Sequence, residues 1–337
     1  STASNKATNY YEIDLEEAIA ASDQITALKY WWLMFRRQAF TGFLDALLKN
    51  SADYAKELGE RLKDRVFVEV FPQFAQGFIA NMRAQGVKSA DIDLDQVFSG
   101  TLTFLYRLMF TLYAESLELV PVNEVRGYRE YSLYEMKRAI AAEGKDLQDE
   151  APGRLKAYYS SRDTDLYARL TKLFTVIDEG SDDLNMPTYN GGLFSQETDS
   201  GRFLAQYRIP DRYLALGLDR LARDIDPKTQ ALVFIDFKSL GVRQLGSIYE
   251  GLLEFRLRLA TETLAVTKEK GKEVYQPAKQ VKKPLATIAL GDAYLENDKR
   301  ERKATGSYYT PDYIVKYIVR HTVGPVLDRK FESRPPA

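Results

Sequence analysis

The run Leu105-Tyr-Arg-Leu-Met-Phe-Thr-Leu-Tyr-Ala-Glu115 decides the fold class, because its large apolar residues recur every three or four positions. Such spacing gathers them on one face of an α-helix that packs against other helices. We therefore expect a mainly α protein, a multi-helix bundle. The same periodicity predicts further helices at residues 133–142, 155–177, 213–222 and 240–257, and in the segment that carries Trp31 and Trp32, which Ser22 can cap.

Strand signals lie later in the chain and are short. One apolar run indicates a single strand, and two alternating stretches with turn residues indicate small β-hairpins. The segments concerned are residues 232–235 for the strand, residues 263–276 for the first hairpin, which turns at Lys270-Gly271, and residues 294–298 for the second. We place a domain boundary near Leu285, between a helical domain of residues 1–284 and a C-terminal part of residues 285–337.

The composition limits the partners and the compartment. The 47 basic and 48 acidic residues leave a net charge of -1, so any contact with nucleic acid must come from a local patch. The chain has no cysteine, which fits a reducing compartment and excludes thiolate metal sites. No run reaches the roughly 20 apolar residues that span a bilayer, and no signal pattern precedes the first helix. We expect a cytoplasmic protein that has no membrane partner.

A junction near the C-terminus combines a rigid turn with a helix start. Arg302-Lys-Ala-Thr-Gly-Ser-Tyr-Tyr-Thr-Pro311 runs directly into a helical pattern over residues 312–323. Thr310 is placed to cap this helix, and Pro311 suits its first position because that position needs no donor. The helix should pack one face against something larger, since its apolar residues recur at helical spacing: Tyr313, Ile314, Tyr317 and Ile318.

This junction resembles motif X, the start of the methyltransferase region in adenine-specific DNA methyltransferases of restriction-modification and phage-defence systems. The resemblance is greatest to type IIG enzymes and BREX-type methyltransferases. Five further blocks resemble segments of the same family and occur in its order. They are Lys29-Tyr-Trp-Trp-Leu-Met-Phe-Arg-Arg37, the run of residues 105–115 quoted above, Tyr189-Asn-Gly-Gly-Leu-Phe194, Ile235-Asp-Phe237 and Val242-Arg-Gln-Leu-Gly-Ser-Ile-Tyr-Glu-Gly-Leu-Leu-Glu254.

The resemblance implies S-adenosylmethionine as cofactor, with Tyr308, Tyr309, Thr310 and Pro311 at its methionine end. A helix start offers free amides to a carboxylate, and a tyrosine ring can lie against a cation. The family's catalytic tetrapeptide, Asn-Pro-Pro-Tyr or a close variant, is absent, as is the glycine-bearing cofactor loop. We therefore expect no catalytic residue here and no methyl transfer from this chain alone.

The expected role is mechanical. The helical domain would be a connector that fixes the spacing between an upstream nuclease domain and a downstream methyltransferase domain. The chain would end at the first helix of a truncated α/β methyltransferase domain, in a parent enzyme that acts on double-stranded DNA.

A basic segment lies beside the junction. Residues 268–303 contain ten Lys or Arg and six Asp or Glu. We expect Lys299, Arg300, Arg302 and Lys303 to contact the DNA backbone. The alternative is a solvated hairpin with a face of mixed charge.

Two other function classes fit parts of the sequence. Pro210-Asp211 followed by Asp236-Phe237-Lys238 matches the loose pattern of a metal-dependent nuclease of the PD-(D/E)xK kind, in which Asp211 and Asp236 would hold the ion and Lys238 would assist the attacking water. The other alternative is a noncatalytic helical module that binds DNA or docks on a protein.

Two single residues need a structural interpretation. Glu115 lies on the apolar face of its helix, so we expect it to be partly buried and paired with Arg36, Arg37 or Arg107. His321 is the only histidine, and without cysteine or nearby acids it does not predict a zinc site.

Overall fold

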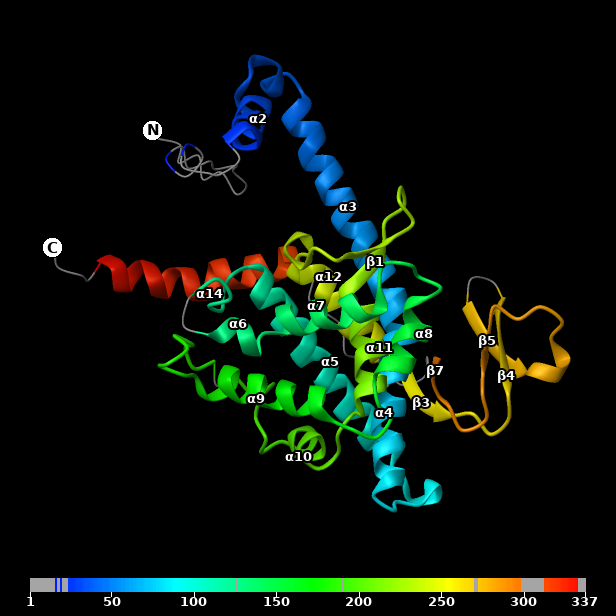
Figure 1. Ribbon diagram of the computed structural model, residues 1–337. Helices are drawn as coiled ribbons and strands as arrows, with labels where there is room; N and C mark the ends of the chain where they lie inside the picture. The colour runs from blue at the N-terminus through cyan, green and yellow to red at the C-terminus, as the bar shows by residue number, and fades with distance from the viewer. Residues whose placement is uncertain are drawn as a thin grey trace. The chain divides into compact units, whose positions relative to one another are not determined.

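The computed structural model describes residues 16, 19, 24–124, 127–189, 191–269, 272–297 and 312–332. Residues in helices far outnumber residues in strands in these ranges, which confirms the mainly α class (Figure 1). The chain divides into two compact units, Ser1–Leu58 and Gly59–Ala337. The boundary near Leu285 stays a prediction. In the described ranges, no helix is both long and apolar enough to cross a bilayer.

The first unit contains helix α2 (Gln24–Phe35), the 3₁₀ turn η1 (Arg37–Phe40) and most of helix α3 (Phe43–Arg65). Trp31 and Trp32 lie on α2 as predicted, but they are 42% and 58% exposed. The guanidinium of Arg36 lies 4.6 Å from the centre of the Trp32 ring. The predicted cap, Ser22, lies outside the described residues. This unit therefore presents aromatic surface on its own helices.

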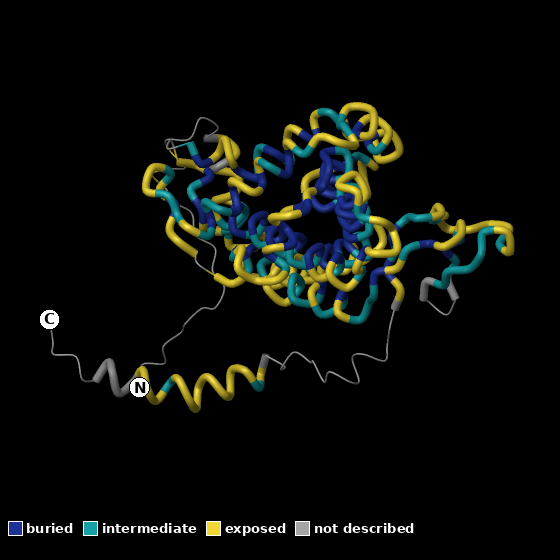
Figure 2. The backbone as a smooth tube through the Cα atoms, turned by 90° about the horizontal axis from the view of Figure 1, so that it is seen from below, coloured by how far each residue is buried: buried dark blue, intermediate teal, exposed yellow. Residues whose placement is uncertain are grey.

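The second unit is built on five helices: α4 (Phe71–Ala84), α5 (Leu94–Ser116), α9 (Asp165–Glu179), α10 (Asp199–Gln206) and α11 (Asp211–Ala222). Five consecutive residues in a π-helical turn, η2 (Val66–Val70), join α3 to α4. Asp93 caps α5 by accepting from the backbone nitrogens of Asp95 and Gln96. Buried apolar residues lie on all five helices, and Figure 2 shows buried segments in the interior of the described chain.

An aromatic cluster centred on Phe104 of α5 holds these helices together. The Phe104 ring is edge-on to Phe74 and Phe78 of α4, at 5.3 and 5.9 Å between ring centres, and it stacks on Tyr167 of α9 at 5.5 Å. Each such pair contributes about 0.5–1.5 kcal/mol beyond its buried area. α5 is thus fixed against both neighbouring helices.

Two glycines let helices approach more closely than a side chain would allow. A Cβ atom on Gly100 of α5 would lie 2.2 Å from the ring of Phe203 on α10. A Cβ atom on Gly217 of α11 would lie 2.2 Å from the ring of Phe74 on α4. Both close approaches are possible only because glycine has no side chain. An added Cβ atom would force the neighbouring ring or helix to shift, since the core is already well packed.

The predicted helix at residues 133–142 is confirmed as α7 (Leu133–Gly144), which follows the short α6 (Tyr128–Tyr131). The single helix predicted over residues 155–177 is wrong. Two helices replace it, α8 (Ala151–Tyr158) and α9.

The break between α8 and α9 is held by hydrogen bonds that do not depend on helical geometry. The Ser160 hydroxyl accepts from the backbone nitrogens of Arg162 and Asp163. The carbonyls of Ser160 and Asp163 in turn accept from the nitrogens of Arg212 and Asp211 at the start of α11. The Ser160 side chain thus replaces helical bonds where the chain leaves the helix.

Strand β1 (Arg223–Ile225) pairs with β2 (Leu232–Phe234), which confirms the single predicted strand. The 3₁₀ turn η4 (Phe237–Ser239) and helix α12 (Val242–Leu252) follow. The helix predicted up to residue 257 is too long. Strand β3 (Phe255–Leu259) begins first, because Phe-Arg-Leu-Arg-Leu alternates with the period of a strand.

The first predicted hairpin is confirmed, since β4 (Leu264–Glu269) pairs with β5 (Lys272–Pro277) in an antiparallel ladder that β6 (Ala286–Ile288) extends. The second predicted hairpin is different. Its strand, β7 (Ala293–Asn297), pairs with β3 from before the first hairpin. The two sheets are linked where the Tyr275 hydroxyl donates to the carbonyl of Leu295.

Candidate functional site

The eight residues predicted to bind cofactor or DNA all lie outside the described residues, so their positions stay predictions. They are Lys299, Arg300, Arg302, Lys303, Tyr308, Tyr309, Thr310 and Pro311. Helix α14 (Asp312–Glu332) begins immediately after Pro311, which confirms the predicted helix and extends it through Pro325. Tyr313 and Tyr317 on α14 are 73% and 65% exposed. These side chains are thus exposed, and their packing against a partner stays a prediction.

Four of the blocks that carry the family resemblance meet on one helix. The block Leu105 to Glu115 forms the second half of α5. Tyr106 of α5 packs on Tyr249 of α12, at 4.8 Å between ring centres. Phe110 packs edge-on against Phe194 at 5.4 Å, and Phe237 is buried in η4, which contacts α5. Segments far apart in sequence therefore share α5 as their common support.

Arg107 anchors one of these segments to α5. Its Nε donates to the carbonyl of Leu193 at 2.8 Å, and its Nη2 donates to the carbonyl of Ser195 at 3.0 Å. The guanidinium carbon lies 5.6 Å from the ring centre of Phe174 and 5.8 Å from that of Phe194. Burial lowers the pKa of Arg107, but arginine stays protonated in proteins. This cation thus positions the loop that follows Tyr189.

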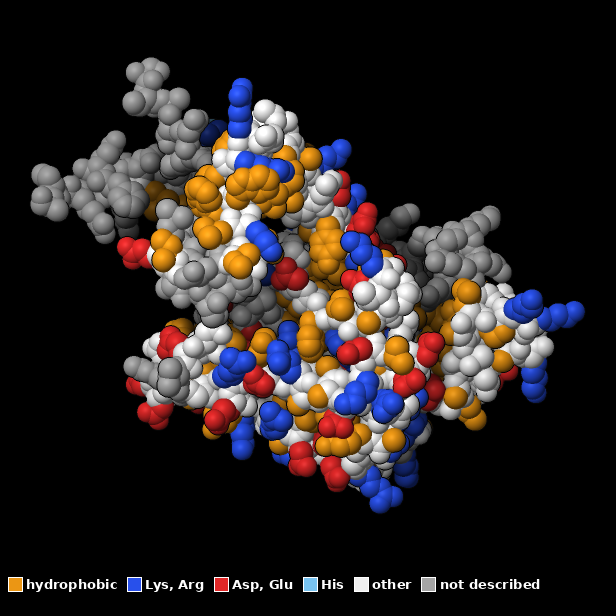
Figure 3. All heavy atoms as spheres, turned by 45° about the horizontal axis from the view of Figure 1, so that its top comes forward, with side chains coloured by type: hydrophobic (Ala, Val, Ile, Leu, Met, Phe, Trp, Pro, Cys, Tyr) orange, Lys and Arg blue, Asp and Glu red, His pale blue; other side chains and the backbone are white. Residues whose placement is uncertain are grey.

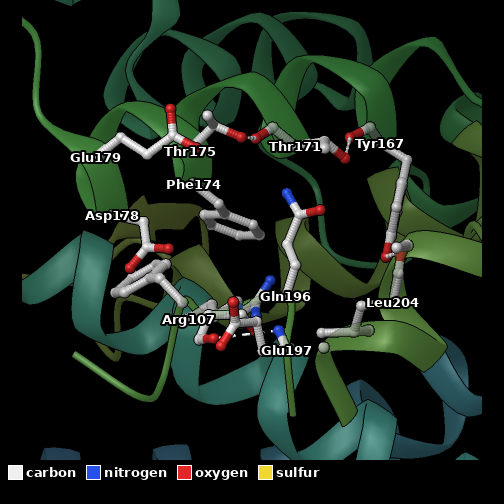
Figure 4. A pocket seen from close by; sticks show the side chains of 14 residues that line it. Arg107, Tyr167, Thr171, Phe174, Thr175, Asp178, Glu179, Gln196, Glu197 and Leu204 are labelled. Atoms are coloured by element: carbon white, nitrogen blue, oxygen red, sulfur yellow. Dashed lines mark hydrogen bonds between the residues drawn. The ribbon is translucent and has the colours of Figure 1, made fainter. Parts of the chain in front are cut away.

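A pocket of about 580 Å³ lies beside Arg107, between α9 and the residues that lead into α10 (Figure 4). Figure 4 shows the Gln196 side chain extending into its middle. Asp178 lines it with a buried Oδ1 atom that has no hydrogen-bond partner in the described part of the chain. The pocket also has the carboxylates of Glu179 and Glu197 in its lining. Its lining thus combines one arginine with three acids, which favours ligands that donate hydrogen bonds.

Glu115 is buried as predicted, but its predicted arginine partner is wrong. Its Oε1 accepts from the hydroxyl of Tyr128 at 3.2 Å and from the backbone nitrogen of Leu133 at 2.8 Å. Leu133 is the first residue of α7, so the carboxylate lies at the positive end of that helix dipole. Arg107 is bound elsewhere, to the two carbonyls described above. The hydrogen-bond partners of Glu115 are therefore the phenol of Tyr128 and the first backbone nitrogen of α7.

Burial raises the pKa of Glu115 to about 7, and its hydrogen bonds oppose part of that rise. Lys137 on α7 also favours the charged form. Its ammonium lies 5.6 Å from the ring centre of Tyr134 and 5.2 Å from that of Phe234, and burial lowers its own pKa. Glu115 is therefore a proton-binding group close to neutral pH.

The three residues of the nuclease alternative are not brought together. Asp211 begins α11, and its Oδ1 accepts from the nitrogen of Leu166. Asp236 follows Ile235, whose nitrogen bonds the carbonyl of Ala222 at the other end of α11. A helix of 12 residues is about 16 Å long between its end residues, so one ion cannot bridge both carboxylates. Lys238 lies beside Asp236, which accepts from its backbone nitrogen.

Over the described ranges there is no group of three or more His, Asp or Glu side chains that could hold a metal ion. His321, on α14, packs against Tyr317 at 4.3 Å between ring centres.

The anchoring role of Arg107 and the exposed carboxylate-rich pocket were not predicted from the sequence. One signal was present, because Arg107 is the only charged residue between Asp95 and Glu115 in an otherwise apolar and hydroxyl-bearing run. A lone cation on a buried helix face requires acceptors. The identity of those acceptors, two backbone carbonyls, has no sequence signal. Comparison of the chain with protein-family models, with curated proteins and with solved structures finds no match.

Proposed function

We propose that this chain is the helical connector of an adenine-specific DNA methyltransferase of the restriction-modification or phage-defence kind. The observation that carries the proposal is the convergence of four blocks, ordered as in that family, on α5. Tyr106 contacts Tyr249 of α12, while Arg107 and Phe110 both contact the loop of Leu193 and Phe194, and all three belong to one block.

A methyltransferase of this kind must extrude its target base and hold it at a fixed position while the duplex stays bound. Errors of about 1 Å in such positioning cost large factors in rate. A connector is useful only if it is stiff. The Phe104 cluster and the close approaches at Gly100 and Gly217 give the second unit the interlocked packing that this role needs.

S-adenosylmethionine supplies the methyl group when it is bound. Tyr308, Tyr309, Thr310 and Pro311 would hold its methionine end, at the start of α14. The free amides of that helix start favour a carboxylate group. The exposed apolar residues of α14, which include Tyr313, Tyr317 and Ile318, would pack on the methyltransferase domain.

The test uses the product of the complete gene, incubated with tritiated S-adenosylmethionine and duplex DNA. We expect label on the N6 amine of adenine, and no label from the 337-residue chain alone. In the complete product, Tyr309→Ala should reduce transfer, whereas Tyr158→Ala, at a tyrosine that is 63% exposed on α8, should leave it unchanged. A complete product that labels no adenine refutes the proposal.

A further inference from the structure

The connection between β5 and β6 carries three exposed lysines. Lys279 lies in the 3₁₀ turn η5 (Ala278–Gln280), and Lys282 and Lys283 follow before β6 begins. None of these three side chains forms an ion pair with a residue in the described ranges. At the far right of Figure 3, where Figure 1 places β4 and β5, Lys and Arg side chains stand out from the surface. We call Lys279, Lys282 and Lys283 the lysine surface.

Several other charged residues of these sheets stand in register with a residue of opposite charge. In the β4–β5 ladder, the Cα partners include Lys268 with Glu273 and Glu269 with Lys272. On the β3–β7 pair, Arg258 Nε bonds Glu296 at 2.9 Å. The lysine surface lies between β5 and β6, outside the ladder, and forms no ion pair with a residue in the described ranges.

One acid lies close to the lysine surface along the backbone. The nitrogen of Ala278 donates to the carbonyl of Thr263, which places Glu262 near the start of η5. Counting this acid against the three lysines leaves an excess of two positive charges. The whole chain has a net charge of -1, so this excess is local, as nucleic-acid binding by this chain requires.

We infer that the lysine surface contacts phosphates of duplex DNA. This inference rests on the proposed function, because an enzyme that extrudes a base must hold the flanking duplex. The four-residue step from Lys279 to Lys283 spans at most about 14 Å. That length corresponds to about four base pairs along the duplex axis. Lysine ammonium groups bind phosphate as point charges and need no fixed geometry, which suits an exposed connection.

The lysine surface is separate in sequence from the predicted contacts at Lys299, Arg300, Arg302 and Lys303. It precedes β6 and β7, whereas those four follow β7. Loss of one set should therefore leave the contribution of the other in place, as expected for independent phosphate contacts.

The experiment measures binding of the 337-residue chain to a fluorescein-labelled 20-base-pair duplex by anisotropy, over a series of salt concentrations. The test variant is Lys279→Ala, Lys282→Ala and Lys283→Ala together. The matched control is Lys88→Ala, Lys172→Ala and Lys228→Ala, three exposed lysines of the second unit outside these sheets. Each lost phosphate contact lowers the logarithmic salt slope by about 0.9, so the test variant should lose about 2–3 and the control nothing.

A second variant, K282E with K283E, should weaken binding further than the alanine changes, and circular dichroism checks that all variants fold. Three results overturn the inference: no duplex binding by the unchanged chain, an unchanged slope in the test variant, or competition by polyglutamate equal to that by DNA at the same charge, which would indicate an acidic protein partner. The methylation assay on the complete product is separate. If that assay fails while the slope falls as expected, the proposed function fails and the DNA contact stands.

Discussion

The hydroxyl of Tyr128 and the backbone nitrogen of Leu133 donate to the same oxygen of Glu115, at 3.2 and 2.8 Å. Glu115 is 7% exposed. The arrangement joins α5 to the start of α7 through a carboxyl group that burial makes hard to ionise.

The stability of the second unit should fall as the pH rises from about 4.5 to about 7. The folded protein holds the Glu115 proton more tightly than the unfolded chain, because its pKa is raised from 4.5 to about 7. Protonated Glu115 adds about 3 kcal/mol to the free energy of unfolding. This contribution is fully present below pH 4.5 and is lost above about pH 7. Glu115→Gln stays neutral and keeps the acceptor oxygen. Urea unfolding should show it to be the more stable form at pH 8 and nearly equal at pH 4.5. Parallel pH profiles for the two proteins would contradict this.

Gly100→Ala should destabilise the protein by about 1–3 kcal/mol, because its Cβ would lie 2.2 Å from the Phe203 ring. The same change at Gly153 provides the control. No atom lies within 4 Å of a Cβ there, and the residue is inside α8, so Gly153→Ala should stabilise by about 0.5–1 kcal/mol. Thermal unfolding compares the two. Equal effects would mean that α5 and α10 can move apart freely.

Arg107→Lys should loosen the loop that contains Leu193 and Ser195. Lysine keeps the charge but cannot donate to both carbonyls in the fork geometry of a guanidinium. Hydrogen bonds to a charged group contribute about 1.5–3 kcal/mol each, so the loss should be measurable by urea unfolding. Hydrogen exchange should rise at Phe194 and its neighbours. Arg83→Lys, at an exposed position at the end of α4, is the matched control and should change neither quantity.

Asp224→Asn should weaken the attachment of β1 to the last turn of α3. Burial raises the pKa of Asp224, but Arg65 and Arg61 outweigh burial and leave it below the ordinary value of 3.8. A carboxylate with a lowered pKa stabilises the fold above that ordinary value and loses its effect as the pH falls further. The difference between the wild type and Asp224→Asn should therefore be present at pH 7, about 1–3 kcal/mol, and shrink below pH 4. A difference that is constant down to pH 2 would rule out the ion pairs as its source.

Local periodicity predicted most helices, because an apolar stripe at helical spacing is a property of neighbouring residues. It failed at residues 159–164, where Leu155 and Leu166 keep apolar residues near helical spacing although the chain leaves the helix between them. The backbone carbonyls of Ser160 and Asp163 that hold this break need partners at the start of α11, which lies far away in sequence.

Long-range partners explain the other errors. The burial of Glu115 was predictable from its place on the α5 face, but Tyr128 and α7 cover that face, and nothing local to Glu115 indicates them. In the same way, β7 was predictable as a strand, while its pairing with β3 depends on how the intervening hairpin folds back. The convergence of four blocks on α5 is likewise a property of the packed chain. The predicted cofactor and DNA residues after β7 remain predictions.

The position of Trp31 and Trp32 makes the two units separately observable in solution. These are the chain's only tryptophans, and both belong to α2 in the first unit. Indole emission therefore reports on the first unit alone, whereas far-ultraviolet circular dichroism is dominated by the many helices of the second. If the two signals change at different denaturant concentrations, unfolding is not a single all-or-none transition, and the first unit can unfold while the second stays folded, or the reverse.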